Sequence, residues 1–228
     1  MHREGEELPI RIAKKSRLVK PIETAINRQN RIKEIYFYYM QVLGTIPYQG
    51  ERTEIVVDEK QWRPLRMTGG RLHVSPALAK DQEKLMAQYR KFCARKMRRI
   101  IEKHFRRLLD KKIQYAIKYE GGSEKRQRIS AREYAKLLGI EKIRYEIGHY
   151  SSEWGINSLD AKRKEFVLHF NVSLIMYDKD RKIGFVVAHE VAHIFERGHD
   201  RAFQDVLSKL YAGKRGHERF WDKEVGNI

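Results

Sequence analysis

The chain has 228 residues and a formal net charge of +18, with a sequence pI of about 9.9. Hydrophobic residues make up 41%, enough for a core, while 34% charged residues and a mean hydropathy of −0.69 exclude an integral membrane protein, because no stretch approaches roughly 18 apolar residues. The single cysteine, Cys93, excludes an internal disulfide framework and fits a reducing compartment. We expect a cytoplasmic protein with one domain, or one domain and a helical extension.

The first part of the chain is predicted to be a basic extension, residues 1–44. It is polar and irregular to about residue 20, carries no apolar core of a secretory signal, and then has helical spacing of apolar residues from Pro21 to Gly44. The main domain is predicted to cover residues 45–228. It begins with short strands at 46–57, 62–67 and 71–74, separated by Gly50, Pro64 and Gly69-Gly70.

A long helix is predicted from Ser75-Pro76 to about Tyr119, where Gly121-Gly122 ends it. Cys93 falls on its apolar stripe, which favours a small buried core residue. Residues 90–112 contain 11 Lys or Arg and only two acidic residues. Such a basic face could bind nucleic-acid phosphate or another polyanion, or it could simply be solvated. No signature of a known RNA- or DNA-binding fold accompanies it.

The second half alternates strands and helices. Ser130 and Glu133 form a capping box for a short helix that Gly139 stops. Strands are predicted at 142–147 and 165–170, and a final helix at 201–211. Asp178 or Asp180 is placed to cap the intervening helix. The elements together predict a helix-rich mixed fold with no internal repeat.

The intervening helix carries the most informative motif, His189-Glu190-Val191-Ala192-His193, followed by His199. A spacing of four residues places His189 and His193 on one helix face, so both imidazoles can reach one metal ion. Glu190 lies about 100° around the helix, beside the metal, where a general base for a metal-bound water is needed. A catalytic zinc site needs three protein ligands and one open position, and the three histidines supply them.

The chain between the second and third histidines decides the subtype. The metzincin pattern, which shares this histidine spacing, places a glycine three residues after the second histidine, and that position here is Glu196. The glycine is instead Gly198, for which we predict a left-handed conformation that ends the helix and turns His199 toward the metal. The metzincin assignment therefore fails.

The stretch from residue 152 to 207 resembles the YgjP-like metallopeptidase family. The matching pieces are Trp154-Gly155-Ile156-Asn157-Ser158, the strand 165–170, the segment 186–193, and His199-Asp200-Arg201-Ala202-Phe203. Weaker similarity extends the resemblance to about residues 45–210. The sequence departs from the family pattern at Glu153, Asn157 and Gln204, where the family has Arg, Cys and Trp, so substrate contacts near the first two are expected to differ.

The resemblance implies an α+β, zincin-like metallopeptidase domain with a small mixed or antiparallel sheet and long helices, preceded here by the N-terminal helical extension. It implies His189, His193 and His199 as zinc ligands and Glu190 as the base, the same four residues that the spacing indicates. It also implies that an extended substrate lies against a strand beside the metal helix, and the strand 165–170 is either that strand or an ordinary core strand.

The sequence therefore predicts a zinc-dependent hydrolase that cleaves peptide or protein substrates. Two alternatives remain: a nucleic-acid-associated protein that binds through the basic helix, and a metal-dependent hydrolase of phosphoanhydrides, whose anionic substrates the positive charge would favour. Candidates for supporting roles are Tyr145, His149 and Tyr150 as oxyanion stabilisers, and Glu196, Asp200 and Asp205 as carboxylates that orient the ligand imidazoles. No oligomeric state is predicted.

Overall fold

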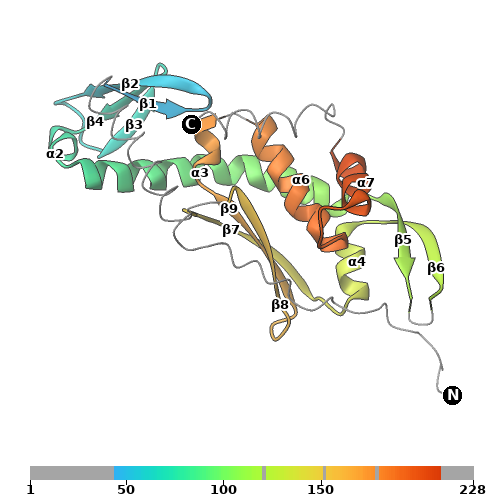
Figure 1. Cartoon of the computed structure of the whole chain (residues 1–228). Coiled ribbons are helices and arrows are strands. Elements are labelled where there is room, and N and C mark those ends of the chain that lie inside the picture. The colour runs from blue at the N-terminus through green and yellow to red at the C-terminus, as the bar shows by residue number, and fades with distance from the viewer. Residues whose placement is uncertain (1–43, 120–121, 151–152, 178–179, 212–228) are drawn as a thin grey trace.

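The computed structural model describes residues 44–119, 122–150, 153–177 and 180–211. The fold is mixed α+β, with three small sheets and several shorter helices arranged around one long helix, α3 (Gln82–Asp110) (Figure 1). The predicted helix from Pro21 lies outside the described residues, so the division between an extension and a domain near residue 44 stays a prediction. No helix in the described ranges is both long and apolar enough to cross a membrane.

The first sheet lies at the N-terminal end of α3 (Figure 1). Its strands are β1 (Thr45–Tyr48), β2 (Glu51–Val57), β3 (Leu65–Thr68) and β4 (Arg71–Val74), in the order β1-β2-β4-β3. The β2–β4 pair is parallel and the other two pairs are antiparallel. Gly69 and Gly70 form the β3–β4 turn with φ of 58° and 75°, a conformation that glycine adopts without a steric penalty. The strands predicted at 46–57 and 71–74 are confirmed, with 46–57 divided into a hairpin, and the strand predicted at 62–67 is confirmed only from residue 65.

Two helices follow, α2 (Pro76–Ala79) and α3, capped by Ser75 and Asp81. The prediction of one helix to Tyr119 is wrong, because α3 ends at Asp110 and the chain turns into a hairpin of β5 (Ile113–Lys118) and β6 (Glu124–Ile129). Apolar residues recur at every second position in β5, which is strand periodicity. Cys93 is fully buried in α3, as predicted, and burial raises the pKa of its thiol to about 12.

The third sheet contains β7 (Lys142–Gly148), β8 (Gly155–Asp160) and β9 (Glu165–Asn171), in the order β7-β9-β8. Strands β7 and β9 are parallel, and β8 runs antiparallel to β9. The strands predicted at 142–147 and 165–170 are confirmed. Strand β8 was not predicted, because Asn157 and Ser158 interrupt its apolar pattern.

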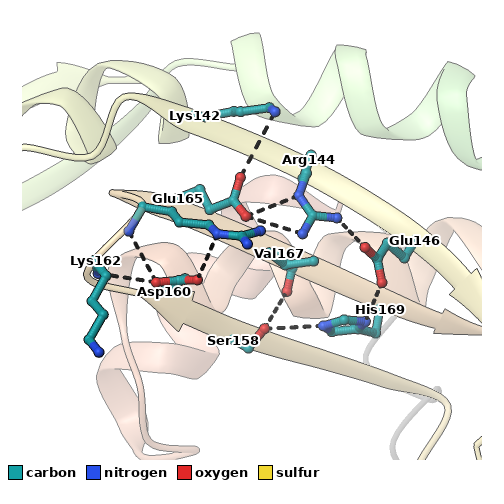
Figure 2. A network of polar contacts seen from close by, with 10 residues as sticks. Lys142, Arg144, Glu146, Ser158, Asp160, Lys162, Glu165, Val167 and His169 are labelled. Atoms are coloured by element: carbon teal, nitrogen blue, oxygen red, sulfur yellow. Dashed lines mark hydrogen bonds and ion pairs between the residues drawn. The ribbon is translucent and has the colours of Figure 1, made fainter.

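One face of this sheet carries a polar network (Figure 2). Glu165 is only 4% exposed, and its carboxylate accepts hydrogen bonds from Arg144 at 3.1–3.2 Å. Glu146, which also pairs with Arg144, lies 3.5 Å from His169 Nδ1, and His169 Nε2 lies 3.1 Å from the hydroxyl of Ser158. Polar contacts therefore fix this face, while the opposite face packs into the core.

The remaining helices are α4 (Ala131–Leu137), α5 (Leu174–Tyr177), α6 (Arg181–Phe195) and α7 (Arg201–Leu210). The predicted capping box of Ser130 and Glu133 is present at the start of α4. Asp180 occupies the N-cap position of α6, but its carboxylate makes no capping hydrogen bond and lies 2.5 Å from His104 Nε2 of α3. Helix α6 packs against α3, α4, α7, β8 and β9, so it is central to the fold (Figure 1).

Candidate metal centre

Three histidine side chains converge beside α6. The Nε2 atoms of His189 and His193, one helical turn apart, are 3.2 Å from each other, and His199 Nε2 is 3.0 Å from that of His189. One donor atom from each of the three residues lies within 4.8 Å of the others. Tetrahedral zinc with Zn–N bonds of about 2.0–2.1 Å needs ligand nitrogens roughly 3.3 Å apart. The three donor nitrogens are therefore close enough together to share one metal ion.

The segment after α6 brings the third histidine to this point. The helix ends at Phe195, and Glu196 is extended, with φ −131° and ψ 123°. The prediction of a left-handed Gly198 is wrong, because its φ is not positive and the departure from the helix occurs at Glu196. Asp200 then caps α7 by accepting a hydrogen bond from Phe203 N at 3.1 Å, which fixes the residue before it, His199, at the start of that helix.

A backbone carbonyl orients the second histidine. His193 Nδ1 lies 3.0 Å from the carbonyl oxygen of Glu196, which accepts the ring N–H and leaves Nε2 for a metal. The three carboxylates proposed for orienting imidazoles are engaged elsewhere: Glu196 accepts from the Tyr115 hydroxyl at 2.9 Å, Asp200 caps α7, and Asp205 pairs within α7. Glu196 thus contributes through its main chain and not through its side chain.

The C-terminal end of α6 is held by aromatic rings from two other elements. Tyr115 of β5, Tyr134 of α4 and Phe195 of α6 have ring centroids 5.0–5.1 Å apart, and the Tyr115 hydroxyl also donates to the Phe195 carbonyl at 3.2 Å. Sequence reasoning missed this cluster because it placed Tyr115 in a helix. The cluster fixes the point where the chain leaves α6 toward His199.

A buried phenylalanine supports the histidine rings. The Phe203 ring centroid is 4.9, 4.6 and 4.8 Å from those of His189, His193 and His199, and Phe203 is fully buried. The sequence matched Phe203 only as part of a pattern and gave it no role. Its position four residues after His199, on the apolar face of α7, was the available signal.

Burial keeps two of the imidazoles neutral. It lowers the pKa of His189 to about 3, with the neighbouring histidines adding to the effect, and it lowers the pKa of His193 to about 4. Only a neutral imidazole can donate its lone pair to a metal. These two residues are therefore in the form that binds metal at neutral pH.

Glu190 is 4% exposed, and burial raises the pKa of its carboxyl to about 8. A nearby cation would favour the carboxylate and oppose this shift. The side chain lies against Gly155 of β8: a Cβ atom at Gly155 would stand 2.5 Å from Glu190 Oε1. Glycine at this position therefore gives the carboxyl group its space.

Asn157 ties β8 to the same residue. Its Nδ2 donates to the Glu190 carbonyl at 2.8 Å, and its Oδ1 accepts from Arg197 at 2.9 Å. The departure from the family pattern at Asn157 therefore lies next to the site. Sequence reasoning marked this position but did not predict the contact with the backbone of Glu190.

The strand beside the site is β8. Strand β9 pairs with β7 on one side and β8 on the other, so of the two roles considered for 165–170 the structure supports the ordinary core strand. Within the described residues, β8 pairs only with β9 and also packs against α6. Two oxyanion candidates face elsewhere: the Tyr145 hydroxyl donates to Glu102 at 2.7 Å, and the Tyr150 hydroxyl is 3.1 Å from His169 Nδ1.

A buried helix that presents two histidines and a glutamate, with a third histidine returning from the following segment, is the arrangement of metal-dependent hydrolases. Comparison with known protein families identifies one that matches this chain. Residues 110–220 match the family described as YgjP-like, metallopeptidase domain, which confirms the resemblance drawn from the sequence. The strands β1–β4 and nearly all of α3 precede the matched segment. No curated protein and no solved structure matched the chain.

Proposed function

We propose that the protein is a zinc-dependent metallopeptidase in which His189, His193 and His199 hold the ion and Glu190 is the general base. The observation that carries the proposal is the convergence of three Nε2 atoms at a helix that also carries the buried Glu190. Imidazole nitrogens suit zinc, and a set of three leaves a position for water and substrate. The match to a metallopeptidase family supports peptide-bond cleavage as the reaction.

A bound zinc ion would supply Lewis acidity and would lower the pKa of water. The remaining chemistry belongs to the side chains. The Glu190 carboxylate takes a proton from water and delivers it to the leaving amine, and general acid–base catalysis of this kind contributes typically 10²–10⁴-fold. Asn157 fixes the backbone of Glu190, and burial excludes competing water from the carboxylate.

The substrate is an extended peptide that adds to the edge of β8 that no strand of the described residues occupies. Main-chain hydrogen bonds between strands bind a peptide without requiring particular side chains. The contacts of Gly155 and Asn157 in β8 with Glu190 support this role for the strand. Glu153, which differs from the family pattern, precedes this strand and is a candidate for side-chain specificity.

The test combines metal content with hydrolysis. Mass spectrometry of the purified full chain should find about one zinc per chain, and His193→Ala should lose both zinc and activity. Glu190→Gln should keep zinc and lose activity on casein or a peptide library by about 10²–10⁴-fold. Unchanged turnover in Glu190→Gln would refute the mechanism, and stoichiometric zinc in His193→Ala would refute the ligand assignment.

Nucleotides in the same assay separate the phosphoanhydride alternative. One outcome is Glu190-dependent hydrolysis of nucleoside triphosphates without any peptide cleavage. It would make phosphoanhydrides, not peptides, the substrate class and would leave the proposed zinc site unchanged. Peptide cleavage with intact nucleotides would support the proposed function.

A further inference from the structure

The exposed side of α3 carries a continuous set of cations, here named the basic face. All of its members are exposed, and Lys103 and Arg106 keep 67% and 75% of their side-chain surface. The members are Lys91, Arg95, Lys96, Arg98, Arg99, Lys103, Arg106 and Arg107. Their spacing of three and four residues aligns them along one side of the helix.

Few carboxylates neutralise this face. Lys103 pairs with Asp180 at 3.2 Å, and Arg106 pairs with Glu102. In the part of the chain that the structure describes, the other six cations form no ion pair. Ion pairs among the described residues therefore do not account for the basic face.

The positive charge continues past the end of α3. A cavity of about 540 Å³ between α3, α6 and α7 is lined by Arg107, Lys111 and Arg181, with Asp180 as its one acidic lining residue. Burial lowers the pKa of Lys111, and the positive charge of the nearby Arg107 lowers it further. The field over this side of the molecule therefore favours an anion.

The opposite side of α3 excludes insertion of this helix into a membrane surface. Its apolar residues, including Tyr89, Met97 and Leu108, are fully buried in the core. A helix that inserts into a membrane surface needs a free apolar face, and α3 has none to offer. The basic face also precedes the matched segment 110–220, so the metallopeptidase match does not account for it.

We propose that the basic face binds the phosphate backbone of a nucleic acid. Five of its eight cations are arginines, whose planar guanidinium forks match phosphate oxygens. From Lys91 to Arg107 the helix covers about 24 Å at 1.5 Å per residue, which is roughly seven base steps of a duplex at 3.4 Å each. Contacts to phosphate carry no sequence information, so binding is independent of base sequence. The interface does not depend on the peptidase activity.

The experiment measures fluorescence anisotropy of a labelled 20-mer duplex DNA, its single strand and the corresponding RNA with the full chain, from 50 to 300 mM salt. The charge-reversal variant is Arg95→Glu, Arg98→Glu and Arg99→Glu. The matched control reverses three exposed cations elsewhere, Lys136→Glu on α4 with Lys162→Glu and Arg163→Glu on the β8–β9 turn, so both variants lose the same net charge. The three probes distinguish DNA from RNA as the source of the phosphates.

Wild type should bind at least one probe with a steep salt dependence. The α3 variant should weaken that binding about 100-fold at 100 mM salt and flatten the log–log salt slope by about 3, one unit for each lost phosphate contact. The control should change affinity less than about threefold, and circular dichroism should show both variants folded. Equal losses in the two variants, or no binding to any of the three probes at 50 mM salt, would overturn the proposal.

Discussion

Helices α3 and α6 pack against each other, yet they use their polar residues in opposite ways. Helix α6 is 15 residues long with ten of them buried, and its site residues are the buried Glu190 and the half-buried His189 and His193. Helix α3 has 29 residues, buries one side in the core and exposes cations on the other. The role proposed for α6 depends on the exact positions of a few atoms, whereas the role proposed for α3 depends on the sum of many exposed charges.

The contrast follows from solvation. In a site shielded from water an electrostatic interaction is strong, and catalysis there depends sharply on the distances between groups. Moving one atom therefore has a large effect. An exposed charge is screened by water and salt, so one residue contributes little and several act together. Three substitutions sharpen this comparison, from the largest expected effect to the smallest.

Gly155→Ala should lower peptidase activity about 10–100-fold, because its Cβ would stand 2.5 Å from Glu190 Oε1 and would displace the carboxyl group by about an ångström. Zinc content should stay near one per chain, since the histidines are not touched. The matched control is Gly198→Ala next to His199, whose Cβ would meet nothing nearer than 4.0 Å. Full activity in Gly155→Ala, measured with the same peptide substrate, would contradict the position assigned to Glu190.

Gly184→Ala should destabilise the fold by about 1–3 kcal/mol, because it overpacks the contact between the two helices. A Cβ at Gly184 would lie 2.7 Å from Cε1 of His104, a buried ring held by Asp180. Urea denaturation of the single variants and of Gly184→Ala with His104→Ala forms a double-mutant cycle. In the His104→Ala background the cost of Gly184→Ala should vanish, and an unchanged cost there would show that the helices do not meet at this point.

Arg99→Ala should have the smallest effect, a change in stability within about 0.5 kcal/mol, because Arg99 is exposed and forms no ion pair among the described residues. Its effect on nucleic-acid affinity should be a loss of a few-fold and a salt slope lower by about 1. Thermal unfolding and the anisotropy titration measure the two quantities. A loss as large as that of the triple variant would mean that Arg99 makes a specific contact and that the face does not act collectively.

Much of the secondary structure could be predicted because it is encoded locally. Turn glycines, the capping box at Ser130 and the alternation in β7 and β9 act over a few residues. The errors occurred where local signals were ambiguous: Ile113 fits both a continued helix and the first residue of β5. The alternation of Ile113, Tyr115 and Ile117 favours the strand, and pairing with β6, which is a tertiary contact, stabilises it.

For the site, the sequence by itself determined the chemical groups and the pairing of His189 with His193, because a spacing of four residues in a helix fixes their relative direction. It also determined the excess of positive charge near α3. Only the tertiary structure decided how His199 returns, that the Glu196 carbonyl and Phe203 support the rings, and that β8, not β9, adjoins the site. These features join segments that are separate in the chain, and their geometry comes from packing, which no local pattern encodes.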